Sequence, residues 1–271
     1  MRRLDAELVV RGLARSRAEA HSAILDGHVL VDGMPSLKPA RMVSDQISIK
    51  VLDTSKAYVS RGALKLIGAL NALHVDLAGQ VVLDAGASTG GFTEVAIERG
   101  AKLVISVDVG YGQLAWSLRS HPSVVVMERT NIRNLSPEEL PSLPTVIVAD
   151  LSFISLTTVL PALTQLVDPL GQMLLMVKPQ FEAGKDLVNA SHGVIRDPQV
   201  RAAAVLTVAR KAIDLDWNVT GVTASPLPGP KGNVEYFLWL THTMPDSTLP
   251  ESLNTQQLEQ LIFRVVEEGP Q

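Results

Sequence analysis

The sequence predicts an α/β protein in two parts, in which a parallel sheet with helices on both faces follows a small α+β domain. From residue 80 onward, apolar runs alternate with amphipathic helical stretches. Runs so uniformly apolar are typical of strands that are buried on both faces of a parallel sheet. This arrangement is Rossmann-like, and its predicted strands are 81–83, 103–107, 124–126, 146–148 and 173–177.

A different pattern occupies the beginning of the chain. Ser16 and Glu19 have the spacing of a capping box, which predicts a helix that begins there and ends near Gly27. Short alternating strands follow around a predicted hairpin turn at Asp32-Gly33. A unit this small holds little core, so its exposed basic residues either bind a partner or are solvated surface charge.

The boundary between the two parts is predicted at residues 53–56, which are polar and lack strong periodicity. The predicted domains are therefore 1–57, which includes this linker, and 58–271. The net charge of −4 taken alone argues mildly against binding to nucleic acid. However, residues 1–57 hold nine Lys/Arg against seven Asp/Glu, or +2, and the remainder holds fifteen against twenty-one, or −6. The excess of basic residues therefore lies in residues 1–57.

Composition excludes several classes of protein. The chain has no cysteine, which excludes disulfides, thiolate nucleophiles and cysteine-based metal sites and fits a reducing compartment. The six His residues show no HExxH-like spacing, so no metal site is predicted. No apolar run approaches the roughly 20 residues that cross a bilayer, and the N-terminus lacks the apolar stretch of a signal peptide. A cytoplasmic protein without membrane contact is expected.

A glycine-rich turn, residues 84–93, follows the first predicted strand of the sheet and leads into a helix. Glycines at such a place let the backbone turn tightly and approach a ligand. The spacing does not match GxGxxG, and the P-loop Lys-Ser/Thr pair is missing, which argues against a nicotinamide dehydrogenase. Asp84 at the strand end suits a cationic ligand, and Asp108 closes the next strand at a position suited to ribose hydroxyls.

Together these residues resemble the S-adenosylmethionine loop of class I methyltransferases, although an ordinary glycine-rich turn would look similar. Asn131, after the third strand, is a further candidate at the adenine end of that cofactor. The candidate cofactor-binding residues are Asp84, Gly86, Ser88, Gly90, Gly91, Phe92, Asp108, Asn131 and Asp150.

Four charged residues lie where a parallel-sheet protein places its chemistry. Lys65 is on the helix before the first strand, Asp150 and Lys178 follow apolar strands, and Glu235 enters a late strand. Ligands bind at the carboxyl ends of such strands. Each residue alone could be a solvated charge or a local ion pair, but Asp150 and Lys178 emerge where buried strands open onto the crevice.

The segments around these four residues, 58–65, 149–155, 177–182 and 232–236, resemble the hemolysin TlyA family, and the resemblance spans nearly the whole chain. It implies an FtsJ-like ribose 2′-O-methyltransferase whose catalytic tetrad maps onto Lys65, Asp150, Lys178 and Glu235. The C-terminal stretch through 264–266 favours the long form of the family, which is associated with both ribosomal subunits. Implied substrates are cytidines of 16S and 23S rRNA in the 30S and 50S subunits, while the oligomeric state stays open.

The tetrad suits methyl transfer to a ribose hydroxyl, because that hydroxyl is a poor nucleophile at neutral pH. Orienting the reactants can contribute on the order of 7–11 kcal/mol, and a general base about 10²–10⁴-fold. Lys178 is the hypothetical base. Desolvation and the charge of Lys65 would favour loss of its proton, whereas Asp150 and Glu235, which would orient the lysines and the hydroxyl, would oppose it.

A second resemblance concerns the front of the chain. Residues 3–5, 12–17, 27–29, 31–33 and 38–39 resemble the RNA-binding module named after ribosomal protein S-four, which implies that the helix pair presents Arg and Lys to structured RNA. Phe153, Phe181 and Tyr236 could each stack a flipped base or pack in the core, and Phe153 is the one favoured. The RNA-binding candidates are Arg3, Arg15, Arg17, Lys38, Arg41, Arg61, Phe153 and Lys185.

Two other functions compete with this hypothesis. A non-catalytic RNA-binding ribosome-assembly factor would keep the fold and the RNA surface without methyl transfer, and the intact tetrad argues against it. A membrane-active hemolysin would need a secretion signal or an amphipathic insertion segment, and the sequence shows neither.

Overall fold

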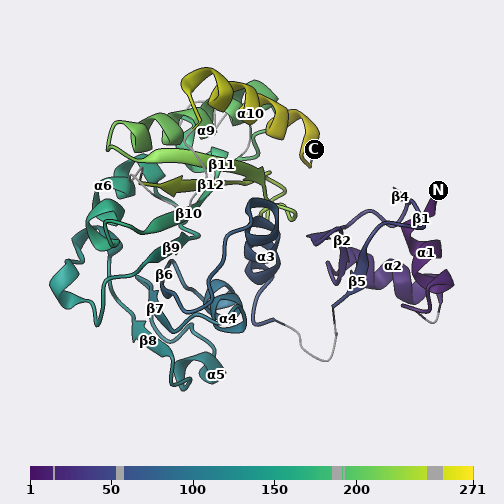
Figure 1. The fold of residues 1–271 in the computed structure, drawn as a ribbon, viewed down its shortest axis with the longest axis horizontal. Coiled ribbons are helices and arrows are strands. Elements are labelled where there is room, and N and C mark those ends of the chain that lie inside the picture. The colour runs from purple at the N-terminus through teal and green to yellow at the C-terminus, as the bar shows by residue number, and fades with distance from the viewer. Residues whose placement is uncertain (15, 53–57, 185–190, 192, 243–252, 271) are drawn as a thin grey trace.

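The structure is a computed structural model that describes residues 1–14, 16–52, 58–184, 191, 193–242 and 253–270. A small unit of two helices and short strands precedes a large sheet flanked by helices (Figure 1). The predicted linker, residues 53–56, lies outside the described residues. The elements of the first unit are β1 (Arg2–Arg3), α1 (Leu4–Val10), α2 (Arg17–Leu25), β2 (Val29–Val31), β3 (Met34–Pro35), β4 (Met42–Val43) and β5 (Ile49–Val51).

The first unit follows the sequence prediction closely. The Ser16 hydroxyl accepts a hydrogen bond from the Glu19 backbone N–H, which caps α2, and α2 ends at Leu25. β2 pairs antiparallel with both β3 and β5, and the β2–β3 turn lies at Asp32-Gly33. Its small core contains the buried side chains Leu4, Leu8, Ala20, Ile24, Val29, Val31 and Val43.

The large sheet has the strand order β11-β12-β10-β9-β6-β7-β8. Strands β6 to β10 run parallel to one another, whereas β12 runs antiparallel to both β10 and β11, between which it lies. All five apolar runs form strands, so the predicted fold class is confirmed. The strands are β6 (Val81–Ala85), β7 (Leu103–Val107), β8 (Val124–Met127), β9 (Val146–Ala149), β10 (Gln172–Val177), β11 (Asn218–Ala224) and β12 (Tyr236–Thr241).

Helices cover both faces of this sheet (Figure 1). Alternate residues of each strand point to opposite faces: in β10, Leu175 packs against the α6, α9 and α10 side, and Leu174 against the α3 and α4 side. β8 differs from the prediction, because as an edge strand it is only partly buried. The helices are α3 (Gly62–Leu73), α4 (Gly91–Glu98), α5 (Trp116–Arg119), α6 (Leu156–Leu166), α7 (Pro179–Glu182), α9 (Pro198–Ile213) and α10 (Thr255–Glu268), with 3-10 turns η1 (Ile132–Asn134) and η2 (Pro137–Glu139).

Helix α3 packs very closely against the segment after β11. A Cβ atom on Gly68, in the middle of α3, would lie 2.6 Å from Pro226 Cγ, so the absence of a side chain allows this approach. Every residue from Ala63 to Leu70 is buried. The position of α3 is therefore set by packing along most of its length.

A buried polar cluster lies under the glycine-rich turn. The Thr93 hydroxyl donates to Asp84 Oδ2 at 2.7 Å and lies 2.8 Å from Ser106 Oγ. Asp84 is fully buried, and among the described residues its Oδ1 has no hydrogen-bond partner. Burial therefore raises the pKa of Asp84 to about 7, an effect that the Thr93 bond opposes.

The packing at Gly68 predicts an unusual effect of Gly68→Ala. A Gly→Ala change in an exposed helix raises the free energy of unfolding by about 1 kcal/mol, whereas overpacking a core lowers it by about 1–3 kcal/mol. Because the Pro226 ring occupies the space for a Cβ, we expect Gly68→Ala to lower the free energy of unfolding by about 1 kcal/mol in urea denaturation. On a Pro226→Ala background the same change should stabilise the protein, and a loss there would contradict the packing argument.

Asp84 predicts a pH dependence of stability. Between about pH 4 and pH 7 the folded protein holds this carboxyl protonated while the unfolded chain has lost the proton, so stability falls as the pH rises. Asp84→Asn keeps an acceptor for Thr93 and cannot ionise. From pH 5 to pH 8 the wild type should lose about 2 kcal/mol more unfolding free energy than the variant, measured in urea without cofactor. Equal pH dependence of the two proteins would disprove the assignment.

Candidate active site

A cavity of about 500 Å³ opens at the carboxyl ends of β6, β9 and β10. Its wall comes from the start of α3, the glycine-rich turn, the residues after β9 and β10, and the segment before β12. The structure thus brings all four predicted catalytic residues together with five of the nine predicted cofactor residues, and Asp150 belongs to both sets. The lining includes Lys65, Asp150, Lys178, Glu235, Gly86, Ser88, Gly91 and Phe92.

Two lysine–carboxylate pairs form within this cavity. Lys65 Nζ donates to Glu235 Oε2, and both side chains are nearly inaccessible to solvent. Lys178 Nζ lies 2.6 Å from Asp150 Oδ1 and donates to Ser152 Oγ at 2.8 Å. The Asp150 side chain is 24% exposed, so this second pair is the one that opens toward the cavity. Each buried ammonium is therefore compensated by one carboxylate.

The glycines of the turn are required by contacts within the protein. Gly86 has φ +88°, and a Cβ there would lie 2.7 Å from the Asp150 carbonyl oxygen. A Cβ on Gly91 would lie 2.1 Å from Ser60 Oγ. Gly90, at φ +102°, lies against Leu118. Close packing of the turn against α3 and the end of β9 thus brings the cofactor-loop backbone beside the tetrad.

Asp108 organises the same turn from the next strand. Its Oδ2 accepts from the Ser88 backbone N–H at 2.8 Å, and its Oδ1 accepts from the Gly110 N–H at 2.6 Å. Ser88 has φ +48°, a left-handed conformation that this bond helps to hold. Among the predicted cofactor residues, Asp84, Gly90, Asp108 and Asn131 are not part of the cavity lining, and Asn131 instead caps η1 through the Arg133 N–H.

The residues around the cavity fit S-adenosylmethionine. The volume is within the range of about 300–1,000 Å³ typical of small-molecule sites. Two carboxylates follow parallel strands at this edge: Asp150 lines the cavity, and Asp108 accepts a hydrogen bond from the backbone of Ser88, which also lines it. Negative charge at this edge suits a ligand with a cationic sulfonium and ammonium group.

Aromatic side chains lie beside the second lysine pair. Phe153 is 92% exposed, has φ +64°, and its ring centroid lies 5.3 Å from that of Phe181. Lys178 Nζ lies 5.9 Å from the Phe181 ring centroid. Tyr236 is fully buried in the sheet core, so of its two predicted roles the structure shows core packing. An exposed phenylalanine in a left-handed conformation is unusual unless its position has a use.

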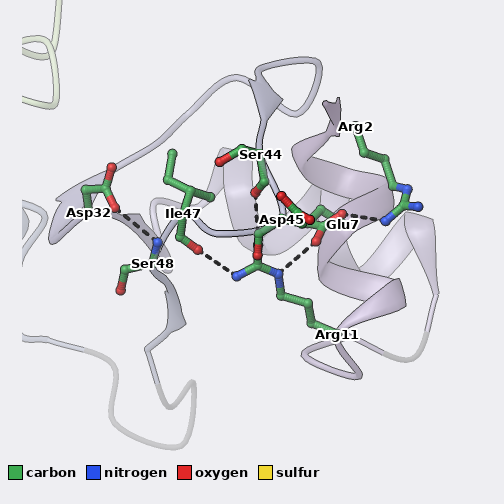
Figure 2. A network of polar contacts seen from close by, with 8 residues as sticks. All are labelled: Arg2, Glu7, Arg11, Asp32, Ser44, Asp45, Ile47 and Ser48. Carbon is green, nitrogen blue, oxygen red and sulfur yellow. Dashed lines mark hydrogen bonds and ion pairs between the residues drawn. The ribbon is translucent and has the colours of Figure 1, made fainter.

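Buried acids organise the arginines of the first unit. Asp5 accepts from Arg3 at 2.8 Å and from Arg17 at 3.1 Å, and these arginines hold the pKa of Asp5 down to about 2. Glu7 pairs in the same way with Arg2 and Arg11 (Figure 2). The pKa of Glu7 is lowered by its bonds to Arg11 and Arg2.

Arg11 has a structural role that its sequence position did not indicate. Its guanidinium donates to the backbone carbonyls of Ser44, Asp45 and Ile47 (Figure 2), which tie α1 to the loop before β5. Arg3 and Arg17 keep 46% and 62% of their side-chain surface exposed, and Lys38, Arg41 and Arg61 are also exposed. Arg15 and Lys185 lie outside the described residues.

Sequence reasoning did not identify Ser60 and Ser152 as part of the site. Both line the cavity, but neither belongs to a sequence motif that indicates a catalytic or binding residue. In the described part of the chain, no group of three His, Asp or Glu side chains could hold a metal ion. Within the same residues, no helix has the length and apolarity needed to cross a bilayer.

Comparison with known proteins gives the family. The FtsJ-like methyltransferase family matches residues 58–242, and the S4 domain family matches residues 2–46. The 16S/23S rRNA (cytidine-2′-O)-methyltransferase TlyA of Mycobacterium tuberculosis (strain CDC 1551 / Oshkosh) is 55% identical over 269 residues, which cover 99% of this chain and 98% of that protein.

Two solved structures are also similar. A Streptococcus thermophilus protein with the provisional name hemolysin is 34% identical, with a TM-score of 0.71 over 98% of this chain and 96% of that one. A Lactococcus lactis protein with the same provisional name is 41% identical, with a TM-score of 0.69 over 76% of this chain and 97% of that one. The chain belongs to the TlyA family of FtsJ-like methyltransferases, S-adenosylmethionine-dependent enzymes, and carries an S4 domain ahead of its methyltransferase domain.

Proposed function

We propose that this enzyme methylates the ribose 2′-hydroxyl of cytidines in 16S and 23S rRNA, acting on the small and large ribosomal subunits in the cytoplasm. The observation that carries the proposal is the pairing of Lys178 with Asp150 at the open side of the cavity, beside the glycine-rich turn. The cytidine and the two rRNAs are those in the name of the Mycobacterium tuberculosis relative.

The cofactor would be held by the turn from Gly86 to Phe92, with Asp108 supporting the turn from beneath. When bound, S-adenosylmethionine supplies an electrophilic methyl group on a positively charged sulfur. The chain's own contribution is to hold a ribose in line with that group, and such orientation can account for roughly 7–11 kcal/mol of the barrier. The roles of Asp84 and Asn131 toward the cofactor remain proposals.

Lys178 is placed to handle the proton of the ribose hydroxyl. Its Nζ is fixed by Asp150 and Ser152, so a hydroxyl that reaches the open side of this pair meets both a nitrogen and a carboxylate oxygen. As the oxygen attacks, its proton passes to Lys178 Nζ, and Asp150 balances the resulting charge. Lys178 enters this step as the neutral amine, after its own proton has passed to solvent at the open side of the pair.

The second pair holds the other side of the cavity. Lys65 and Glu235 are too buried to exchange freely with solvent, and Lys65 keeps a positive charge close to the hydroxyl oxygen, where negative charge develops during attack. Glu235 fixes the direction of the Lys65 side chain. These roles make Lys65 and Glu235 orienting members of the tetrad.

RNA would bind across the S4 domain and the rim of the cavity. Arg3 and Arg17 are pre-oriented by Asp5, and Lys38, Arg41 and Arg61 are exposed. Such contacts hold phosphates and the shape of the RNA. Phe153 would stack a base turned out of the helix, and Arg15 and Lys185 complete the proposed set.

Removing Lys178 tests the proposed chemistry. We expect Lys178→Ala to lower methyl transfer to ribosomal subunits by about 10²–10⁴-fold, because the proton acceptor is lost, with cofactor affinity nearly unchanged. Lys178→Arg should be almost as slow, since a guanidinium keeps the charge but does not give up its proton. The assay is transfer of labelled methyl from S-adenosylmethionine, with exposed Lys102→Ala as control.

Near-normal transfer by Lys178→Ala would reject Lys178 as the base. If the wild type binds cofactor and ribosomal RNA yet labels neither subunit nor naked rRNA, the protein is a non-catalytic assembly factor and the proposed function fails.

Phe153 predicts opposite effects on activity and stability. Phe153→Gly removes the side chain that would stack on RNA, so kcat/KM for ribosomal subunits should fall by about tenfold or more. The change also relieves a left-handed φ of +64°, so the free energy of unfolding should stay equal or rise by about 1 kcal/mol. Urea denaturation and the methyl-transfer assay measure the two effects. A variant with full activity would show that Phe153 does not touch the substrate.

A further inference from the structure

The β2–β3 turn of the S4 domain contacts helix α3 of the methyltransferase domain. Asn71 Nδ2, on α3, donates to the Gly33 carbonyl oxygen at 2.6 Å, and Arg99 Nη2, at the end of α4, donates to Asn71 Oδ1 at 2.8 Å. A carbonyl only accepts and a guanidinium only donates, so a single orientation of the amide satisfies both partners. We call these three residues the Asn71 latch.

Apolar packing surrounds the Asn71 latch. A Cβ on Gly27, in the S4 domain, would lie 2.9 Å from Leu64 Cδ1 of α3, so the Leu64 side chain packs directly on the Gly27 backbone. Leu37 and Leu52 pack against the same core cluster as α3. Apolar contacts are non-directional, whereas the Asn71 hydrogen bonds are directional. The latch can therefore define the orientation of the S4 domain that the packing alone leaves adjustable.

The two helices joined by Asn71 both begin at the catalytic cavity. Lys65 lies in the first turn of α3, and α4 begins at Gly91 of the cofactor turn. At the near ends of these helices, the Val59 N–H donates to Glu94 of α4 at 2.8 Å. The S4 turn thus meets α3 at the end remote from the cavity and is linked through Asn71 to the corresponding end of α4. A change in the position of the turn is therefore a change relative to both helices that form walls of the site.

We propose that Asn71 is a positioning residue that fixes the S4 domain relative to the catalytic cavity, so that RNA held by the S4 arginines presents its target ribose to Lys178 and Asp150. This inference rests on the proposed function. Five of the eight proposed RNA contacts belong to the S4 surface, and cofactor affinity belongs to the cavity. Loss of the latch therefore lowers the fraction of bound RNA that is correctly placed, and acts on kcat more than on either affinity.

Asn71→Asp separates the two halves of the latch. An aspartate still accepts from Arg99, which keeps α3 joined to α4, but it cannot donate to Gly33. We expect kcat for ribosomal subunits to fall by roughly tenfold, with KM for the subunits and Kd for S-adenosylmethionine each within about twofold of wild type. Asn134→Asp, which adds the same charge at an exposed site on η1, is the control and should leave all three unchanged. An Asn71→Asp enzyme with wild-type kcat would overturn the proposal.

An engineered disulfide tests the same point in the opposite direction. A Cβ on Gly33 would lie 3.8 Å from Asn71 Cβ, and disulfides have Cβ–Cβ distances of about 3.5–4.5 Å. The chain has no cysteine, so Gly33→Cys/Asn71→Cys contains a single possible pair. The reduced variant should be about tenfold slower than wild type, and oxidation should restore most of kcat. Both forms carry the same strain at residue 33, where φ is +79°, so their comparison isolates the cross-link.

An oxidised variant that is inactive while its reduced form is active would show that the domains must move apart, and would also overturn the proposal. Failure of the proposed function looks different, because the wild type itself would then label no ribosomal RNA. In that case small-angle X-ray scattering tests whether the Asn71 latch fixes the position of the S4 domain. The radius of gyration of the reduced double variant should exceed that of the oxidised form, and equal values would reject the latch.

Discussion

The buried ion pair between Lys65 and Glu235 is the interaction on which the site depends. Both charges are almost completely removed from water, which costs several kcal/mol per ion unless each finds the other. The pair joins residues 170 positions apart, on α3 and just before β12. The antiparallel β12 next to β10 is what brings Glu235 to the edge where Asp150 and Lys178 emerge. A parallel strand entering from the other end of the sheet would carry Glu235 away from this edge.

At the same edge of the sheet, residues that are proposed to bind the cofactor are also required by close packing within the protein. The glycines of the cofactor turn look, in sequence, like residues kept small for a ligand. In the structure, Gly86 meets the Asp150 carbonyl and Gly91 meets Ser60, so each would be glycine even without a ligand. The consequence for function is proximity. Because the turn rests directly on the end of β9, the proposed cofactor turn and the proposed catalytic carboxylate belong to one unit of closely packed backbone.

The sequence predicted the sheet, and the emergence of Asp150 and Lys178 at strand ends, because both depend on local pattern. Uniform apolar runs indicate burial on two faces, and a charged residue directly after such a run must emerge at the strand end, as Asp150 and Lys178 do. The order of the strands in the sheet was not predictable, since an apolar pattern does not specify which strands lie next to each other. Nor could the sequence show that β8 is an edge strand, or that Asp84 is buried beneath the turn with a raised pKa.

A protein with a net charge of −4 can present a basic surface because its acids and bases lie at different depths. Asp5 and Glu7 have about 5% of their side-chain surface exposed, whereas the exposed fractions of Arg2, Arg3 and Arg17 are around half. Each buried carboxylate orients two guanidinium groups, and arginine that is already oriented loses less side-chain entropy when it meets a phosphate. Arg11 is the exception, since its donors are used by Glu7 and three backbone carbonyls. Net charge therefore says little about partners here, and the depth of each charge says more.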